Sequence, residues 1–422
     1  MTLDALLRRG SIAYLVIWVI SPPLAYGAAW RVLAALAMLL WLVLEMRSSR
    51  SVILRPSLPI LGAVLIAIYT ALIESLVPDA ADINRQFQLW IMYFFLLVGE
   101  SFRRGREGDA RFCFWLVLCL LPIWELTTLW GIETISGDVA RTVVRSSVEA
   151  RELSERGVGG YGLVYAVVLG LPFIATMALR KGALSQVSGV PWKRRTARAL
   201  VWVNFILAVL LVLNAGYSIA VILAAFALIS LVLVRSRRTL PMLISICLSS
   251  LLALVALVSI SPMLRGLEGV AEGTEYAAKL ADIRTSLEEG DSTGTVEGRA
   301  ERYARSMSLF LENPILGTLT FDDVGKHSAI LDRFAQYGFV VGLVFLLLLL
   351  YVPIAMVRAP AISLGMALAF LVVAAGLPLL NNVFMTWGLM LYMFSRGALA
   401  VLGHPVPVSG RTVRSTEAPA HA

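Results

Sequence analysis

The stretch GFVVGLVFLLLLLYVPIAMV, residues 338–357, decides the fold class of this protein. It contains no charged side chain, and its length of about 20 residues is what an α-helix needs to cross the hydrocarbon core of a membrane. A soluble protein would have to bury such a helix on every side. The stretch therefore predicts a transmembrane helix.

Apolar stretches of similar length recur along nearly the whole chain. Of its 422 residues, 59% are hydrophobic and only 15% are charged, and the mean hydropathy is +0.81. A soluble core cannot bury so many apolar side chains, so the composition excludes a soluble globular protein. We predict an all-α polytopic integral membrane protein with about twelve transmembrane helices in a single domain, residues 1–403. The expected helices span residues 11–27, 31–46, 57–77, 86–101, 112–131, 159–179, 199–214, 217–234, 240–261, 338–357, 361–378 and 383–400.

The positive charge of the chain indicates its topology. The formal net charge is +8, and the basic residues lie mostly in short clusters between the apolar runs. Cytoplasmic loops of membrane proteins carry an excess of Lys and Arg, so these clusters are topology signals and do not indicate a nucleic-acid partner. With Arg8 and Arg9 in the cytoplasm, every expected inner loop contains arginine and both termini are cytoplasmic. The polar, proline-rich tail 404–422 is predicted to be disordered.

Two long segments, about 132–158 and 262–337, are then left on the outer side, and they offer room for a site. The second contains EGRAERYARSMSLFLENPILG, residues 297–317, in which apolar residues recur at helical spacing. We expect an amphipathic helix near the outer membrane surface, stopped by Asn313 and Pro314. Its apolar positions are Tyr303, Met307, Phe310 and Leu311.

Both outer loops are rich in arginine, although topology signals place basic residues inside. The guanidinium group matches phosphate and stays charged, so these arginines predict an anionic, phosphorylated ligand. They are Arg141, Arg145, Arg151 and Arg156 in the first loop and Arg299, Arg302 and Arg305 in the second. The alternative is that they pair with loop carboxylates such as Glu152, Glu155, Glu297 and Glu301.

Arg156 precedes a glycine-rich stretch in ERGVGGYGLVYA, residues 155–166, at the outer start of an expected helix. Gly157, Gly159 and Gly160 would let a ligand approach the backbone closely, and a helix N-terminus offers free N–H groups to an anion. The alternative is close helix packing through small residues, which is frequent in membranes.

His327 is the one histidine that lies outside the last twenty residues. It precedes the stretch at 338–357 on the expected outer face, and in a helix over 327–337 it would share a side with Ile330, Leu331 and Phe334. Imidazole titrates near neutral pH and suits general-base work on a hydroxyl, although a lone histidine is more often structural. A cation held by Asp322, Asp323 and His327 is a further alternative.

Together these residues predict a glycosyl transfer. His327 would activate a hydroxyl acceptor, and arginines would neutralise a pyrophosphate leaving group, which needs charge stabilisation more than a general acid. Such a reaction requires no metal.

The chain resembles the superfamily of bacterial O-antigen ligases and Wzy-type O-antigen polymerases. The resemblance lies in ENPILG (312–317) with arginines upstream, then His327-Ser328 followed by Gly338; the second family glycine falls one position off, at Gly342. It implies a metal-independent inverting glycosyltransferase that needs no cofactor and acts on undecaprenyl-pyrophosphate-linked sugars at the periplasmic face of the bacterial inner membrane. His327 would be the essential histidine and Arg299 the arginine before ENPILG.

The sequence context is more similar to the polymerase branch, in which a second lipid-linked repeat unit is the acceptor. We expect His327 and Arg299 to be catalytic and Arg156, Arg302, Arg145 and Gly157 to bind pyrophosphate. Expected partners are the lipid-linked oligosaccharide, membrane lipid and a chain-length regulator. The alternatives are a ligase that transfers the polymer to lipid A-core and, from another class, a lipid-linked oligosaccharide flippase, for which Glu125 is the intramembrane acid.

Overall fold

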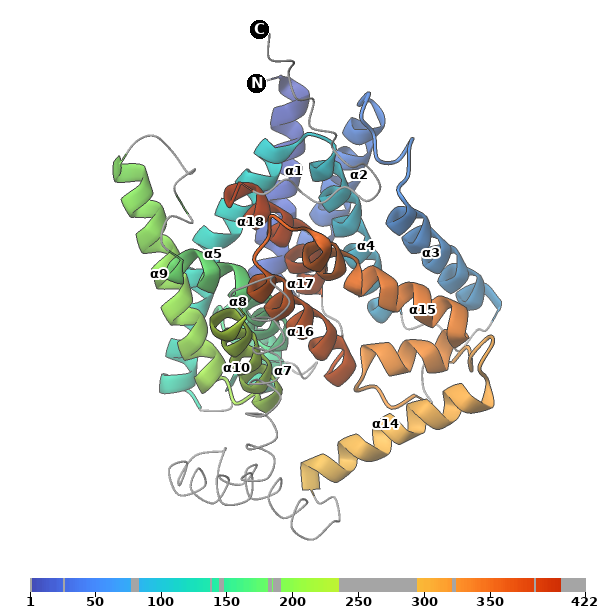
Figure 1. The fold of residues 1–422 in the computed structure, drawn as a ribbon. Helices are drawn as coiled ribbons and strands as arrows, with labels where there is room; N and C mark the ends of the chain where they lie inside the picture. Colours follow the sequence, from blue (N-terminus) through green and yellow to red (C-terminus); the bar gives the residue numbers. More distant parts are fainter. Residues whose placement is uncertain are drawn as a thin grey trace, which may run out of the picture.

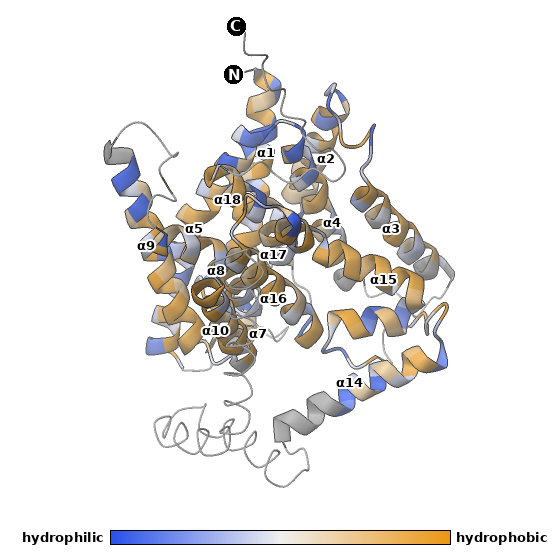
Figure 2. Ribbon diagram, in the orientation of Figure 1, coloured by the Kyte–Doolittle hydropathy of each residue, from blue (hydrophilic) through white to orange (hydrophobic). Residues whose placement is uncertain are grey.

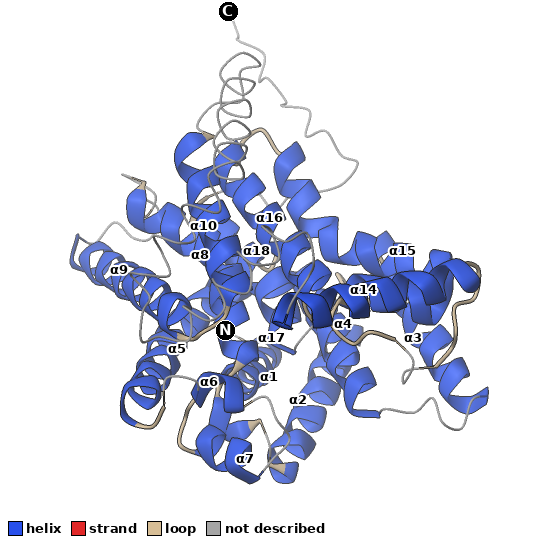
Figure 3. Cartoon of the chain, turned by 90° about the horizontal axis from the view of Figure 1, so that it is seen from below, coloured by secondary structure: helices blue, strands red, loops and turns tan. Residues whose placement is uncertain are grey.

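The structure is a computed structural model. It describes residues 2–25, 27–76, 83–136, 139–143, 148–180, 184, 191–234, 294–320, 324–382 and 385–403. In this described part the chain forms helices joined by loops, without strands (Figure 3). The predicted all-α class is therefore confirmed.

The helices are α1 (Leu3–Ile20), η1 (Pro22–Leu24), α2 (Ala28–Met46), α3 (Leu58–Leu76), α4 (Ile83–Arg103), α5 (Glu107–Thr134), α6 (Val139–Thr142), α7 (Val148–Glu155), α8 (Tyr161–Leu179), α9 (Pro191–Asn214), α10 (Ser218–Leu233), α14 (Gly294–Glu312), α15 (Ala329–Arg358), α16 (Leu364–Leu380), α17 (Met385–Gly388), η3 (Leu389–Phe394) and α18 (Ser395–Val401). The η3 segment is a turn of π-helix that continues α17 into α18. Helix occupies every expected helical segment of the described part, whereas 240–261 lies outside it.

Five of the described helices are long and apolar enough to cross a membrane. They are α2, α5, α8, residues 194–214 of α9, and α15. Shorter apolar helices lie in α3, α10 and α16. The protein is thus a helical, membrane-type bundle, and the number of about twelve spans remains a prediction.

Helix α8 forms the centre of the bundle because its residues are apolar on all sides. Nearly every residue from Leu163 to Ala178 is buried, against α9, α10, α16 and the α17–η3 segment. Gly170 allows this close packing, since a Cβ atom there would lie 2.8 Å from the Cε atom of Met390. Helices α3 and α14 lie at the edge of the bundle, away from α8 (Figure 1).

Polar residues gather at the two ends of the bundle (Figure 2). At the end where α1 begins, Asp109 of α5 accepts hydrogen bonds from Arg8 Nε at 3.2 Å and Arg9 Nε at 2.6 Å. Glu45 of α2 pairs with Arg106 at the same end. Helices α7 and α14, which belong to the two predicted outer loops, both lie at the opposite end (Figure 1).

Candidate functional site

The predicted amphipathic helix in the second loop is confirmed as α14, which ends at Glu312, directly before Asn313 and Pro314. Of its four apolar residues, two face the bundle and two are exposed. Tyr303 and Phe310 face the bundle: the Tyr303 hydroxyl donates to Leu380 O at 3.2 Å, and the Phe310 ring meets Phe334 edge-on at 5.5 Å between centroids. Met307 and Leu311 are exposed, with Leu311 at 68%.

The ENPILG segment that follows α14 stabilises a break in α15. Gly338 has a φ of 72°, so α15 is interrupted there and its two halves meet at a sharp angle (Figure 1). The break exposes backbone groups that an unbroken helix would pair internally. The segment supplies partners, because Phe339 N–H donates to Pro314 O at 2.8 Å and Thr318 N–H donates to Ala335 O at 2.8 Å. We call residues 314–319 and 335–339 together the elbow.

Glycines allow the two segments of the elbow, residues 314–319 and 335–339, to touch. A Cβ atom on Gly338 would lie 2.0 Å from Ile315 O, and one on Gly317 would lie 2.3 Å from the Gln336 carbonyl carbon. Both glycines have a positive φ, which other residues rarely adopt. Gly317 and Gly338, two of the residues that carry the family resemblance, therefore both lie where the two segments of the elbow touch.

His327 lies in the loop before α15, and the helix that follows begins two residues later than the range 327–337 considered from the sequence. Ser328 is the N-cap, and its hydroxyl accepts from Leu331 N–H at 3.2 Å, so the helix starts at Ala329. The C-terminal end of α16 holds the loop on both sides of His327. Ala329 N–H donates to Asn381 O at 3.0 Å, and the Asn382 side chain donates to Lys326 O at 2.8 Å.

A buried serine fixes this loop against α14. The Ser306 hydroxyl donates to Asp332 Oδ1 at 2.6 Å and accepts from Gly325 N–H at 2.9 Å. Gly325 lies so close to α14 that a Cβ atom there would be 2.1 Å from Arg302 O. The sequence analysis missed Ser306, Asp332 and Asn382. A serine on the apolar side of α14 was the one local signal that could have indicated such a support.

The consequence of this packing is that His327 meets Arg302. The Nη1 atom of Arg302 forms a hydrogen bond with Nε2 of His327, which is half-buried, while Arg302 itself is exposed. A guanidinium group has donors and no acceptor, so Nε2 must be the unprotonated nitrogen in this contact. The contact thus requires a neutral imidazole with its proton on Nδ1.

Arg299 lies on α14 three residues before Arg302, a spacing that puts two residues on the same face of a helix. Its side chain lies outside the described part of the structure, as does all of Arg145. Asp322 and Asp323 also lie outside it, so the structure does not test the cation alternative. In the described part, His, Cys, Asp and Glu form no cluster of three or more that could hold a metal.

Gly157 terminates α7. With a φ of +88°, it donates its N–H to Ser154 O at 2.9 Å, and Val158 N–H donates to Leu153 O at 3.0 Å. This pair of bonds is the Schellman motif that caps many helices. Gly159 N–H is also used, because it donates to the Thr128 hydroxyl at 2.8 Å.

The N–H groups of Gly157, Val158 and Gly159 are therefore bonded within the protein. Arg156 is exposed next to this cap. Helix α7 packs on η1, where the Ser154 hydroxyl donates to Pro22 O at 2.6 Å, whereas α14 packs on α15. Helices α7 and α14 share one end of the bundle but pack on different neighbours, and a common pocket remains a prediction.

No protein-family model and no curated protein matches this sequence. The resemblance stated above therefore rests on the motif around His327 and on the multi-helix architecture.

Glu125 of α5 is fully buried, and both of its carboxylate oxygens lack a hydrogen-bond partner in the described part of the chain. It lies one turn before Thr128, near the end of the bundle that holds α7. Buried acids in membrane helices often mark the pathway of a transported substrate or proton, which is the feature that the flippase alternative requires.

Proposed function

We propose that the protein is a glycosyltransferase that polymerises undecaprenyl-pyrophosphate-linked oligosaccharide repeat units into O-antigen or a related surface polysaccharide. The observation that carries the proposal is the contact between His327 and Arg302. It pairs an imidazole with a cation that suits phosphate, at the same end of the bundle as the first arginine-rich loop.

In the proposed reaction, a hydroxyl oxygen of the acceptor sugar attacks the anomeric carbon of the donor. The new glycosidic C–O bond forms as the bond from that carbon to the pyrophosphate oxygen breaks, which inverts the configuration. The hydroxyl proton passes to His327, and the electron pair of the broken bond leaves with undecaprenyl pyrophosphate. Arginines stabilise the negative charge on that leaving group.

Arg302 has two roles in the proposed reaction: it blocks Nε2 of His327 before the donor binds, and it then binds the pyrophosphate. While its guanidinium donates to Nε2 of His327, that nitrogen cannot accept a proton from a hydroxyl. A bound pyrophosphate offers Arg302 a charged acceptor, and charge-assisted bonds are stronger than bonds to a neutral ring. Donor binding would thus draw Arg302 away and free the base, so that His327 becomes active when the leaving group is in place.

Arg299 would act beside Arg302, and Arg156 and Arg145 would complete the pyrophosphate site from the first loop. Gly157, whose N–H group is bonded in the cap of α7, would let the pyrophosphate approach the backbone closely. The proposal places the site at the periplasmic face of the bacterial inner membrane, with both termini in the cytoplasm. A chain-length regulator would be a further partner. The reaction uses no cofactor or metal.

The test is a gel of surface lipopolysaccharide from a strain in which the gene is deleted and then complemented. A polymerase predicts core with a single repeat unit in the deletion strain and a restored ladder with the wild type. His327→Ala, expressed at wild-type level, is expected to give no ladder, and His404→Ala serves as the matched histidine control. An unchanged ladder with His327→Ala would sink the role of His327.

The ligase and the flippase give different results in the same strains. Bare core together with accumulated lipid-linked polymer in the deletion strain would indicate the ligase. Transport of lipid-linked oligosaccharide across sealed vesicles, without formation of a glycosidic bond, would indicate the flippase, and Glu125→Gln would then be expected to abolish it.

A further inference from the structure

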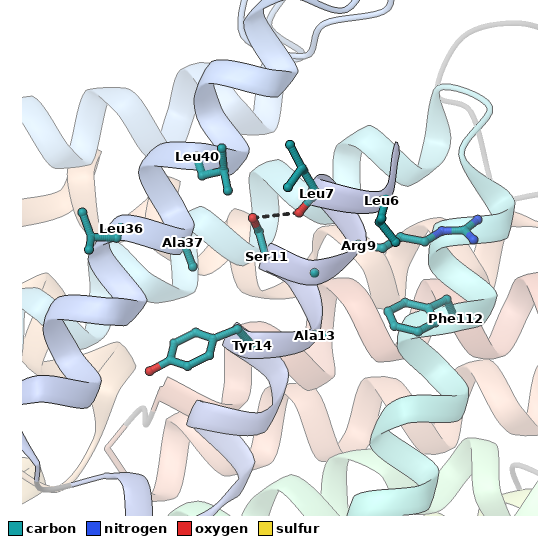
Figure 4. A pocket seen from close by; sticks show the side chains of 11 residues that line it. Leu6, Leu7, Arg9, Ser11, Ala13, Tyr14, Leu36, Ala37, Leu40 and Phe112 are labelled. Atoms are coloured by element: carbon teal, nitrogen blue, oxygen red, sulfur yellow. Dashed lines mark hydrogen bonds between the residues drawn. The ribbon is translucent and has the colours of Figure 1, made fainter. Parts of the chain in front are cut away.

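An apolar groove lies between α1, α2 and α5, at the end of the bundle away from His327 (Figure 4). The Ser11 hydroxyl in its wall is used within the protein, because it donates to Leu7 O at 3.1 Å. Apolar walls are expected wherever a membrane protein faces lipid, so they specify no ligand. Strained backbone gives a more specific signal, and it lies in the loop that carries His327.

Two residues other than glycine have a positive φ in the described part of the chain, and both lie between α14 and α15. They are Leu319, with a φ of 60°, and Lys326, with a φ of 61°. Residues with a Cβ atom rarely adopt this left-handed region, because Cβ is then forced against the backbone. Such strain persists only where surrounding contacts hold it, and it is concentrated at active sites. Lys326 directly precedes His327, so the strain lies next to the proposed base.

The end of α16 holds Lys326 in this conformation. The Asn382 side chain donates to Lys326 O at 2.8 Å, and Ala329 N–H donates to Asn381 O at 3.0 Å. A peptide group is planar, so a bond that fixes the carbonyl of Lys326 also fixes the N–H group of His327. His327 therefore lies between two points at which the end of α16 holds the loop.

We propose that Asn382 is a positioning residue: it holds the strained backbone of Lys326 and thereby directs the imidazole of His327 toward Arg302. Without this bond, Lys326 would relax to a negative φ, and the peptide group that leads to His327 would rotate. The imidazole would then turn away from Arg302. The consequence for catalysis rests on the proposed function, whereas the effect on the direction of the His327 side chain does not.

The experiment measures how fast diethyl pyrocarbonate modifies His327 in the purified full-length protein, by mass spectrometry of its peptides. The reagent acylates an unprotonated imidazole nitrogen, and in the wild type Arg302 occupies Nε2. Asn382→Ala is expected to speed the modification about fivefold, which corresponds to the net contribution of one hydrogen bond. Asn214→Ala is the matched control and should keep the wild-type rate, because the exposed Asn214 side chain also donates to a backbone carbonyl at 2.8 Å, at the end of α9. A wild-type rate in Asn382→Ala would overturn the proposal.

Replacement of Lys326 tests whether strain is what the Asn382 bond opposes. Glycine adopts a positive φ without strain, so in a Lys326→Gly background Asn382→Ala should change the modification rate by less than about twofold. Glutamine removes the charge of Lys326 but keeps the strain, so in a Lys326→Gln background Asn382→Ala should still speed the modification about fivefold. Equal effects in the two backgrounds would overturn the proposal.

An assay of polymerisation separates the positioning role from the proposed function. Asn382→Ala is expected to slow polymerisation about fivefold, and the addition of Lys326→Gly is expected to restore it. Polymerisation at the wild-type rate in both Asn382→Ala and His327→Ala would refute the proposed function, while the modification rates would still support the positioning of His327. Loss of polymer in His327→Ala, together with a wild-type modification rate in Asn382→Ala, would overturn the positioning role and leave the proposed function in place.

Discussion

At the scale of single residues, the contact between Arg302 and His327 is the feature that the proposed function depends on most. Arg302→Ala would remove one donor to the pyrophosphate, and the loss of such a donor typically costs about a hundredfold or more in rate. We expect kcat/KM to fall about a hundredfold in an assay with purified lipid-linked repeat units. Arg151→Ala is the control, because Arg151 forms an exposed ion pair with Glu155 at 2.8 Å, and such a pair contributes little to stability. Equal losses in both variants would refute a specific role for Arg302.

Ser306 is the second residue with a large expected effect. Its replacement by alanine leaves the buried carboxylate of Asp332 and the N–H of Gly325 without their shared partner. An unsatisfied buried polar group costs about 1–3 kcal/mol, so the loop that carries His327 should open more often. Hydrogen exchange of residues 324–332 should be faster in Ser306→Ala. Ser308→Ala, which loses an exposed bond to Glu312, should leave that exchange unchanged.

At the scale of elements, the elbow sets the direction of the two halves of α15. Gly338→Ala would force a side chain onto a positive φ and against Ile315 O. We expect a loss of about 2 kcal/mol or more in unfolding free energy, seen as a lower thermal midpoint in detergent. Gly10→Ala is the matched control, since nothing lies near its Cβ position. A midpoint equal to that of the control would show that the elbow can relax.

Apolar side chains are exposed on α14, at Met307 and Leu311, and directly after it, at Ile315 and Leu316. We expect these side chains to enter the headgroup region of the membrane, as those of an amphipathic interfacial helix do. A fluorophore on Leu311→Cys, in a background without the native cysteines, should be quenched by lipid-attached quenchers. The same fluorophore on Arg305→Cys, on another side of α14, should be quenched much less. Equal quenching at both positions would argue against an interfacial helix.

At the scale of the whole molecule, the arginine-rich end at α1 and the end at α14 should face opposite sides of the membrane. A membrane-impermeant thiol reagent added to cells with a permeabilised outer membrane should label Arg305→Cys. It should leave Ser49→Cys, in the exposed turn after α2, unlabelled until the inner membrane is opened. The reverse pattern would invert the topology and remove the proposed periplasmic site.

The sequence by itself determined the membrane class, the positions of the helices and the end of α14 at Asn313 and Pro314. Hydrophobic length, helical spacing and a proline act within one short segment, so they can be predicted without knowledge of neighbours. The sequence also singled out His327 and Arg302, but it could not show that His327 lies in a loop or that Gly157 caps α7.

Only the tertiary structure decided that His327 meets Arg302, that Ser306 and Asp332 support this contact, and that ENPILG forms the elbow with Gly338. These contacts join residues about twenty or more positions apart. Their existence depends on how α14, α15 and α16 pack together. No local pattern specifies such packing, because the partner of a buried polar group is chosen by the fold around it and not by its neighbours in sequence.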